Sequence, residues 1–388
     1  MRHSRRVALI YDARLAYDLK VMTGVAAYHQ ERSDYSVYIE ENALRDQRLP
    51  DLRSWKGDGI IADFDDPTIA RAVLHSRLPV VGFGGGYGWY LPKSRIPYFF
   101  PNNEAVSRLA ATHLLDRGLR HFAYCGYAPT PINGWSKERE KSFSEWINRA
   151  GYSCVVYRGR HKTTRQWVSV QKSLGKWLES LEKPLGVMAA NDNRARQVLE
   201  TCRAFNLRVP EEVAVIGVDN DELLCQLSSP LLTSIEQGAK RIGYEAAALL
   251  DKMMRGKNPT ELHYVTEPVG VVPRKSTDIF AIEDPKVAKA MSFISEHAVD
   301  GIKVRDVVNA VAVSASGLEH RFKSILGYTI RASIRRVQLE RARRLITNTT
   351  LPLKQIASNT GFKSVQHLTT LFGKAFGHPP AEYRKLVV

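Results

Sequence analysis

The last hundred or so residues of the chain hold two copies of one pattern, a short helix followed by a tight turn and a second helix. One copy runs from Lys303 to Gly327 and the other from Pro352 to Arg384. In both, apolar residues recur at steps of three and four, which places them on one helical face. A helix-turn-helix unit offers its second helix to the major groove of DNA. We therefore expect an all-α C-terminal domain that binds double-stranded DNA.

Turn and cap residues support both copies. Gly361 stands where a helix ends, Ser364 is placed to cap the next helix, and Pro379 with Pro380 stops that helix. Ser314 is the matching cap in the first copy. Two amphipathic helices with solvated outer faces are the alternative for either copy alone, but the tandem arrangement argues against that alternative.

The outer faces of the two second helices supply the candidate DNA contacts. These are Ser316, Glu319, His320 and Lys323 in the first copy, and Gln366, His367, Thr370 and Lys374 in the second. Between the copies, residues 329–346 predict a helix of roughly 27 Å, at about 1.5 Å per residue. That length suits two reading helices about one DNA turn apart. Arg343 and the other arginines of this helix are expected to contact phosphates, with solvated surface charge as the alternative.

Residues 284–384 resemble the AraC-type DNA-binding domain, most specifically at GFKSVQHLTTLFGKAFGHPPAEYR, residues 361–384. Leu368 stands where the family usually has Phe and keeps the core apolar. Gly373 stands where Lys is common and weakens its helix by roughly 1 kcal/mol relative to Ala. The resemblance implies these base-reading positions: Ser316, Glu319 and His320 in the first copy, and Gln366, His367, Thr369 and Thr370 in the second.

Length and charge set limits on the whole chain. Its 388 residues give room for two or three domains. Residues 280–388 hold 17 Lys and Arg against 8 Asp and Glu, whereas the first 279 residues hold 39 against 32. The basic excess is thus more than three times denser at the C-terminal end, which fits nucleic-acid binding better than general solubility.

The four cysteines have no metal-type spacing and are expected to be free thiols in a reducing compartment. The basic start of the chain is followed by too short an apolar run for a signal peptide. No stretch is long enough to span a membrane. We expect a cytoplasmic protein with no membrane partner.

The first 280 residues alternate short apolar runs with helical patterns, which predicts doubly wound parallel α/β sheets. The strand-like runs are 7–11, 37–39, 59–62, 80–83, 122–126, 154–157, 186–190 and 213–218. Their number is too large for one sheet, so two α/β lobes in a periplasmic-binding-protein-like arrangement fit better. The expected domains are 1–275 (lobe one about 1–102 plus 236–275, lobe two about 103–235), a linker at 276–285 and the DNA-binding domain at 286–388. Strands at 263–266 and 270–272 are expected to return to lobe one.

Polar residues follow several of these strands. In an open α/β sheet, ligands bind beyond the carboxyl ends of the strands. The residues at such ends are Asp12, Arg14, Asp65, Asn191, Asp192, Arg194 and Asp219. With Trp135 or Tyr127 as an aromatic face for the ring, they suit a sugar, because carboxylates and amides bind hydroxyls. Helix caps and turns are the alternative for any one of them. The glycine-rich run 84–88 is expected to be a flexible loop rather than a phosphate cradle.

These residues lie in a portion that resembles the sugar-binding core of LacI-type repressors and type I periplasmic binding proteins. The motifs are ANDNRA at 190–195, VIGVDN at 215–220, SIEQ at 234–237 and PNNE at 101–104. The resemblance implies ligand contacts from Asn102, Arg139, Asn191, Asp192, Asp219 and Gln237. The family usually has Asp-Asn at the lobe crossing, where this chain has Asn102-Asn103, so one carboxylate acceptor is lost there.

A sugar-binding core followed by an AraC-type domain is the order found in bacterial xylose operon regulators, and the chain is identified as a member of that family. The resemblance also covers IADFDD at 61–66 and VDNDEL at 218–223. It implies a sugar-responsive activator of pentose catabolism genes. D-xylose is the expected effector between the lobes, with no cofactor and no metal. Expected partners are operator DNA, a second copy bound through the first lobe, and RNA polymerase. A regulator that responds to a different sugar is the alternative.

Two other classes of protein fit less well. A transport-type sugar-binding protein would need an export signal and would have no use for the basic tail. An enzyme would need a nucleophile–base pair, metal spacing or a nucleotide loop, and none accompanies the adjacent Asp65 and Asp66. The chain is therefore expected not to be an enzyme.

Overall fold

The computed structural model describes residues 5–32, 35–40, 55–74, 76–86, 95–159, 167–282 and 284–387. The chain divides into two compact units. The first comprises Met1–Thr112 and His121–Thr277, and the second comprises His113–Arg120 and Asp278–Val388. Among the described residues, no helix combines the length and the apolar character needed to cross a lipid bilayer.

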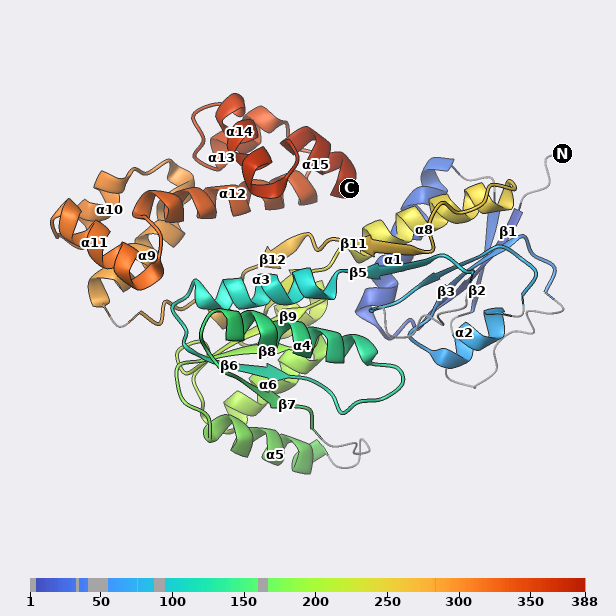
Figure 1. Cartoon of the computed structure of the whole chain (residues 1–388), viewed down its shortest axis with the longest axis horizontal. Helices are drawn as coiled ribbons and strands as arrows, with labels where there is room; N and C mark the ends of the chain where they lie inside the picture. The colour runs from blue at the N-terminus through green and yellow to red at the C-terminus, as the bar shows by residue number, and fades with distance from the viewer. Residues whose placement is uncertain are drawn as a thin grey trace. The chain divides into compact units, whose positions relative to one another are not determined.

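The first lobe of the first unit is one parallel sheet with helices on both faces (Figure 1). Its elements are β1 (Arg5–Ile10), α1 (Ala16–Arg32), β2 (Tyr35–Glu40), β3 (Gly59–Asp63), α2 (Pro67–Leu74), β4 (Val80–Phe83), β5 (Tyr98–Pro101), α8 (Ala239–Met254) and β11 (His263–Thr266). The strand order is β11-β5-β4-β3-β1-β2.

Alternation along the strands explains why helices cover both faces, since successive side chains of a strand point to opposite sides of the sheet. Val7 and Leu9 of β1 pack into the core that α1 and α8 form. The alternate residues of the same strand, Ala8 and Ile10, pack into the core on the α2 side of the sheet. The predicted doubly wound architecture is confirmed.

Helices α1 and α8 lie side by side on one face of this sheet, and two glycines permit their close approach (Figure 1). A Cβ atom on Gly24 would lie 1.8 Å from the carbonyl oxygen of Lys240, and one on Gly243 would lie 1.8 Å from that of Val21. The obstructing atoms are backbone atoms, which cannot rotate away. Neither position therefore has room for even a methyl group.

The second lobe is built on a second sheet. Its elements are α3 (Asn103–Leu115), β6 (His121–Cys125), α4 (Gly134–Arg149), β7 (Cys154–Tyr157), α5 (Trp167–Glu179), β8 (Leu185–Ala189), α6 (Asp192–Ala204), β9 (Val213–Val218), α7 (Glu222–Leu227), β10 (Thr233–Glu236), β12 (Gly270–Val272) and the 3-10 helix η3 (Lys275–Thr277). The strand order is β12-β10-β9-β8-β6-β7. Helices α5 and α6 pack on one face, and Phe143 of α4 packs against Tyr124 on the other.

One strand assignment needs correction. Residues 263–266 and 270–272 were both expected in lobe one, but only β11 lies there, paired with β5. Strand β12 pairs antiparallel with β10 in the second sheet, with Ser234 opposite Val272. The physical reason is that the open edge of β10 needs a hydrogen-bonding partner, which β12 supplies. Strands β5 and β10, of four residues each, were not predicted.

The second unit contains the two predicted helix-turn-helix pairs. Its elements are α9 (Pro285–His297), the 3-10 helix η4 (Ala298–Asp300), α10 (Val304–Val311), α11 (Ala315–Leu326), α12 (Ile330–Asn348), α13 (Leu353–Asn359), α14 (Val365–Phe376) and α15 (Pro380–Val387). Helices α10 and α11 form the first pair, α13 and α14 the second, and α12 runs between them (Figure 1).

Each pair has its own hydrophobic core, and α12 contributes to both. Ile334 packs in the first core and Leu339 packs in the second. Between them, the Gln338 side chain donates hydrogen bonds to the carbonyl oxygens of Ala298 at 2.8 Å and Gly361 at 3.3 Å. Because one helix of roughly 28 Å, at about 1.5 Å per residue, is built into both cores, the two pairs are held at a fixed separation.

Candidate ligand cavity and DNA-reading helices

A cavity of about 870 Å³ is lined by residues of both lobes of the first unit. Strand order reverses between β1 and β3 in the first sheet and between β6 and β8 in the second. Side chains beyond the carboxyl ends of these strands form the cavity walls, as expected where strand order reverses in an α/β sheet. The predicted ligand residues that line it are Asp12, Arg14, Asp65, Tyr127, Trp135, Asn191 and Arg194.

Several lining residues were not among the predicted contacts. Asp63 is the last residue of β3, Asp66 follows that strand, and Arg158 follows β7. Polar residues after a strand were the signal used for the others, so the same rule identifies these. Val170, which reaches the cavity from α5, has no such signal.

Asp65 is the most distinctive acceptor in the wall. One carboxylate oxygen accepts a hydrogen bond from the Gly85 backbone N–H at 2.7 Å, and its own N–H donates to Asp63 at 2.8 Å. Its other oxygen, Oδ1, is buried without a hydrogen-bond partner among the residues that the structure describes. Burial raises the pKa of Asp65 to about 7, although the Gly85 N–H and the nearby Arg139 oppose the rise.

Three glycines let the loop after β4 pack closely against Asp65, Trp135 and Glu138. A Cβ atom on Gly84 would lie 2.3 Å from the Tyr98 hydroxyl, and one on Gly85 would lie 2.9 Å from the Trp135 ring. Close packing, rather than the predicted flexibility, explains Gly84–Gly86 in physical terms. Residues 87 and 88 of the predicted run lie outside the described residues.

Asp12 and Arg14 form an ion pair at the end of β1. The guanidinium donates to both Asp12 oxygens, at 2.7 and 2.8 Å. Burial acts to raise the pKa of Asp12, but the hydrogen bonds from Arg14 outweigh it and hold the pKa below its usual value. Asp12 is therefore a carboxylate at neutral pH, with its charge balanced within the wall.

Donors and aromatic rings come from the second lobe. Arg194 is 4% exposed, and its guanidinium lies over the rings of Tyr127 and Tyr157. Its Nε is buried with no hydrogen-bond acceptor within the described part of the chain. Asn191 caps α6 and accepts a hydrogen bond from the Tyr127 hydroxyl at 2.8 Å. Trp135 stands edge-on to Tyr127.

Arg139 does not line the cavity but lies behind Trp135, with its guanidinium 4.8 Å from the ring centre. It is 2% exposed. Its three nitrogens donate to Asn103 Oδ1 at 2.8 Å, to the Ala190 carbonyl at 2.7 Å and to Gln237 Oε1 at 2.6 Å. A guanidinium bonded in this way joins the lobe crossings at Asn103 and Gln237 to Ala190, the residue that follows β8 of the second lobe.

Gln237 and Asp219 continue this network outside the cavity lining. Gln237 donates from Nε2 to Asp219 at 2.5 Å, and Lys20 of the first lobe donates to the Asp219 carbonyl oxygen at 2.7 Å. Burial raises the pKa of Asp219 to about 7, against the opposing effect of Arg139 and Lys20. These residues therefore connect the two lobes directly.

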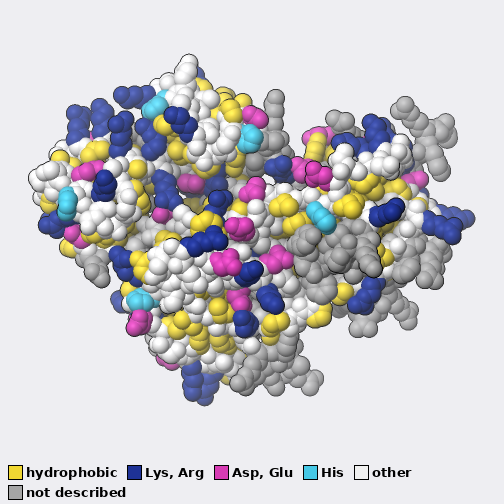
Figure 2. Space-filling view, viewed as in Figure 1, with side chains coloured by type: hydrophobic (Ala, Val, Ile, Leu, Met, Phe, Trp, Pro, Cys, Tyr) yellow, Lys and Arg dark blue, Asp and Glu magenta, His cyan; other side chains and the backbone are white. Residues whose placement is uncertain are grey.

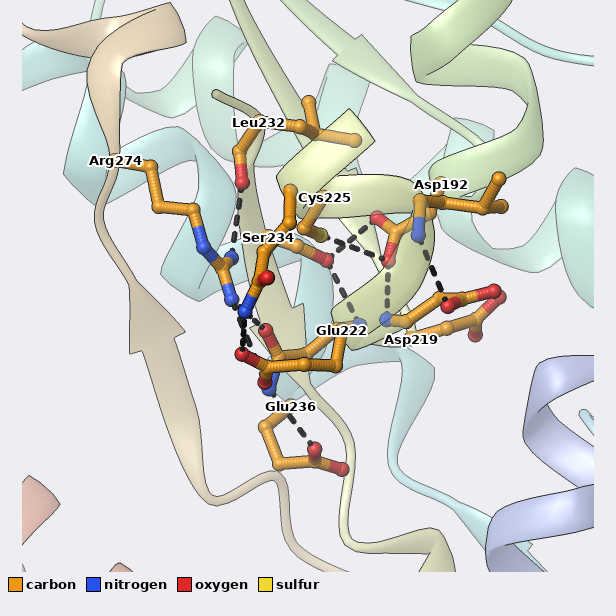
Figure 3. A network of polar contacts seen from close by, with 12 residues as sticks. Asp192, Asp219, Glu222, Cys225, Leu232, Ser234, Glu236 and Arg274 are labelled. Carbon is orange, nitrogen blue, oxygen red and sulfur yellow. Dashed lines mark hydrogen bonds and ion pairs between the residues drawn. The ribbon is translucent and has the colours of Figure 1, made fainter. Parts of the chain in front are cut away.

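Asp192 has a structural role in the arrangement observed. Its carboxylate accepts hydrogen bonds from the Ser234 hydroxyl at 2.6 Å, from the Asp221 N–H at 2.7 Å and from the Cys225 thiol at 3.6 Å (Figure 3). In the same view, Arg274 reaches the Leu232 carbonyl oxygen. Asp192 is 1% exposed, so its oxygens are occupied in holding α6 and α7 to the sheet.

Asn102 also lies away from the cavity lining. It caps α3 by accepting the Ala105 N–H at 3.0 Å, and it donates to Glu267 at 2.7 Å. Its neighbour Asn103, which was not predicted, is the buried residue that bonds Arg139, Glu138 and the Gly85 carbonyl. The departure from the family pattern at Asn102 therefore changes a lobe crossing and not the cavity wall.

The first helix-turn-helix pair presents the predicted polar face on α11. Ser314 caps the helix by accepting the Gly317 N–H, as predicted. Leu318 and Phe322 are buried. Ser316, His320 and Lys323 are exposed and Glu319 is half-buried, so these four side chains lie on the accessible side.

The second pair repeats this arrangement on α14. Ser364 caps the helix by accepting the His367 N–H, as predicted. Gln366, Thr370 and Lys374 are exposed, whereas His367 and Thr369 are half-buried. Burial, together with Arg335 and Lys363, lowers the pKa of His367. Its imidazole is thus neutral at pH 7 and offers one donor and one acceptor.

Arg343 departs from the prediction. It is 5% exposed, bonded to Glu340 at 2.6 Å, and stacked over Phe376 at 5.2 Å. A guanidinium enclosed in the second core cannot reach a phosphate, so the predicted phosphate contact does not fit this position. Arg331, Arg336 and Arg341 are the exposed arginines on the same helix.

The surface of the second unit carries many basic side chains. Exposed Lys and Arg occur on α9, α10, α11, α12 and α14 and in the turns between them. Figure 2 shows dark blue Lys and Arg side chains gathered over the region of α10–α12, with few acidic ones beside them. Such a surface suits the phosphate backbone of nucleic acid.

Family models match most of the chain. Residues 6–104 match the XylR N-terminal domain, residues 111–277 a periplasmic binding protein-like domain, and residues 307–386 a helix-turn-helix domain. The chain is 38% identical to the xylose operon regulatory protein of Escherichia coli strain K12, over 98% of this chain and 96% of the relative. It is 34% identical to the protein of that name from Haemophilus influenzae, over 98% of each.

Solved structures give the same picture. The structure of a xylose-binding transcription activator aligns with a TM-score of 0.64 and 38% identity, covering 98% of each chain. A periplasmic binding protein/LacI transcriptional regulator from Alkaliphilus metalliredigens, complexed with D-xylulofuranose, aligns with a TM-score of 0.57 and 19% identity over 71% of this chain. The second likeness concerns the fold of the two lobes alone.

Proposed function

Because this chain belongs to the family of bacterial xylose operon regulatory proteins, we propose that D-xylose is the effector that binds in its interlobe cavity. As a member of that family the chain is a transcription regulator with a sugar-binding domain and a helix-turn-helix domain. The proposed activity is activation of pentose catabolism genes in the cytoplasm in response to the sugar.

The single observation that carries this proposal is the pair of unused polar atoms in the cavity wall. Asp65 Oδ1, from the first lobe, is an acceptor, and Arg194 Nε, from the second lobe, is a donor. An unmet buried polar atom costs free energy, about 1–3 kcal/mol each. A sugar hydroxyl both donates and accepts, so one neutral ligand satisfies both atoms and draws the lobes together. The Trp135 ring is an apolar surface for the C–H face of the sugar.

Sugar binding controls DNA only if the sugar prefers one arrangement of the lobes. We infer that lobe closure changes how the reading helices of two copies of the chain meet operator DNA. A homodimer places two second units on one operator, and an activator contacts RNA polymerase there. The family membership supports these partners.

Calorimetry of the purified full chain against a panel of aldopentoses and aldohexoses tests the effector. D-xylose is expected to bind more tightly than its epimers. A gel-shift of the DNA upstream of neighbouring sugar genes, with and without D-xylose, tests the response. If no sugar in the panel binds, the effector proposal is wrong, whatever the outcome with DNA.

Asp65→Asn is expected to weaken D-xylose binding by about 10- to 100-fold, since a hydrogen bond to a charged group contributes about 1.5–3 kcal/mol. The affinity of the unchanged protein is also expected to rise with pH. The pKa of about 7 leaves Asp65 mostly protonated at pH 6 and mostly ionised at pH 8. The ionised form is the better acceptor, so binding is expected to be about tenfold tighter at pH 8.

Calorimetry at pH 6, 7 and 8 measures both effects. The Asn variant is expected to lose the part of the pH dependence that comes from Asp65, while operator binding without sugar is unchanged. A variant that keeps the full pH dependence would show that another group, such as Asp219, is responsible.

On the DNA side, His320→Ala and Gln366→Ala are expected to relax sequence preference, each costing on the order of 1–3 kcal/mol on the cognate operator. Lys374→Ala is expected to weaken binding to all sequences and to flatten the salt dependence. All three residues lie on the outer faces of α11 and α14, apart from the buried core. Competition gel-shifts at several salt concentrations separate these outcomes, and identical behaviour of the three variants would contradict the division into reading and positioning residues.

A further inference from the structure

Helix α3 belongs to both compact units. It runs without a break from Asn103 to Leu115, yet its residues up to Thr112 cluster with the first unit and the segment His113–Arg120 clusters with the second. The chain therefore enters the second unit twice, once through the end of α3 and once through the residues that follow Thr277. The contacts at each end of α3 show what the helix connects.

The first end of α3 is bonded to the wall of the interlobe cavity. Asn103, its first residue, is 6% exposed. It accepts a hydrogen bond from Arg139 at 2.8 Å and donates to the Gly85 carbonyl at 2.8 Å. The N–H of Gly85 in turn holds the Asp65 carboxylate. Two hydrogen bonds thus separate the start of the helix from the proposed sugar acceptor.

The other end of α3 is bonded within the second unit. Both oxygens of Asp116 accept hydrogen bonds from the Arg336 guanidinium, at 2.6 and 2.7 Å. The Ala281 N–H donates to the Arg117 carbonyl at 2.7 Å. A bidentate pair fixes orientation as well as distance. Arg336 lies on α12, between the residues that this helix gives to the two cores.

The body of α3 is packed along its length. Val106, Ala110 and Leu114, at helical spacing, are fully buried. Thirteen helical residues span roughly 20 Å at about 1.5 Å each. A helix held on one face by a close-packed core moves as a body, because bending it would open cavities. A shift at Asn103 is therefore transmitted to Asp116.

We propose that α3 transmits the state of the sugar cavity to α12, and that Asp116 is the positioning residue that holds Arg336 for this purpose. The inference rests on the proposed function, since it takes the sugar as the input. The exposed Arg336 side chain sits midway between the two helix-turn-helix pairs, so a change in its anchorage reorients both pairs together. Removing the Asp116 carboxylate is expected to uncouple the two activities and leave each of them intact.

The test compares the full chain with Asp116→Asn, with the charge-exchanged Asp116→Arg/Arg336→Asp double variant, and with Glu145→Gln. The last is a matched control, since it breaks the exposed Lys141–Glu145 pair on α4. For each protein, calorimetry gives the D-xylose affinity, and a gel-shift gives the ratio of operator affinities with and without the sugar. Coupling between two sites typically amounts to about 5- to 150-fold.

We expect Asp116→Asn to bind D-xylose and operator separately like the unchanged chain, but with the ratio reduced to about 1. The exchanged double variant is expected to recover the ratio, and Glu145→Gln to keep it. A full ratio in Asp116→Asn overturns the proposal. Failure of the unchanged chain to bind D-xylose contradicts the effector assignment instead, so the two failures are distinguishable.

A second readout needs no sugar, because coupling is reciprocal. Operator binding is expected to slow hydrogen exchange of the α3 amides and of the loop at Gly84–Gly86 in the unchanged chain, and to leave them unaltered in Asp116→Asn. If operator binding leaves α3 unaltered in the unchanged chain as well, the helix does not carry the signal.

Discussion

Replacing Arg139 with Met is expected to lower the free energy of unfolding of the first unit by about 3–5 kcal/mol, the usual cost of removing one partner from a buried charged network. Met fills similar volume but leaves three buried acceptors, Asn103 Oδ1, the Ala190 carbonyl and Gln237 Oε1, without their donor. It also removes the positive charge that opposes the raised pKa values of Asp65 and Asp219. Both carboxyl groups should then be protonated at neutral pH, which weakens sugar binding as well.

Urea unfolding followed by tryptophan fluorescence measures this loss, because all six tryptophans lie in the first 279 residues. Arg149→Met is the matched control, since Arg149 is exposed on the same helix, and it is expected to change stability by less than about 0.5 kcal/mol. Unchanged stability in Arg139→Met would contradict the structural role assigned to its three hydrogen bonds.

Gly24→Ala is expected to destabilise the first unit by about 3 kcal/mol or more. This is the opposite of the usual effect, since replacing Gly by Ala inside a helix normally increases stability. In an ordinary helix interior, Ala is more favourable than Gly by about 1 kcal/mol. At Gly24, however, the added methyl would lie 1.8 Å from the Lys240 carbonyl oxygen. Helices α1 and α8 must then separate, and overpacking of this kind outweighs helix propensity.

Gly373→Ala in α14 is the control, because this substitution is expected to increase stability. Its added methyl would meet nothing closer than 3.9 Å, so the same substitution is expected to stabilise the second unit by up to about 1 kcal/mol. Thermal unfolding followed by circular dichroism, alongside tryptophan fluorescence for the first unit, records both variants. Stabilisation by Ala at Gly24 would contradict the close approach of the two helices.

The strand-end rule predicted much of the cavity wall from sequence, because the carboxyl ends of parallel strands meet at one edge of a sheet. Asp12, Asp65 and Asn191 follow strands in this way and line the cavity. Arg139 shows the limit of that reasoning. Residue type indicates that a buried guanidinium needs acceptors, but the acceptors come from Asn103, Ala190 and Gln237, which are distant in sequence.

Arg343 shows a second limit. Helical periodicity assumes one buried face for each amphipathic helix, and it then places an arginine outside that face in solvent. Helix α12 packs into two cores, so more of its circumference is buried than one apolar stripe predicts. The capping residues Ser314 and Ser364 were predictable because a cap acts over three residues of local chain. Burial against a remote element has no comparable local signal.

The single helix shared by the two DNA-reading pairs has a consequence for the genes under control. Because α12 holds the two helix-turn-helix pairs at a fixed distance, the two DNA sequences that they contact must lie on the same face of the duplex. We therefore expect the number of base pairs between these two sequences to be nearly the same in every promoter. In the proposed homodimer, we expect promoters to differ in the length of DNA that lies between the footprints of the two subunits. Inserting half a helical turn of DNA inside the footprint of one subunit should abolish binding. The same insertion between the two footprints should reduce binding less.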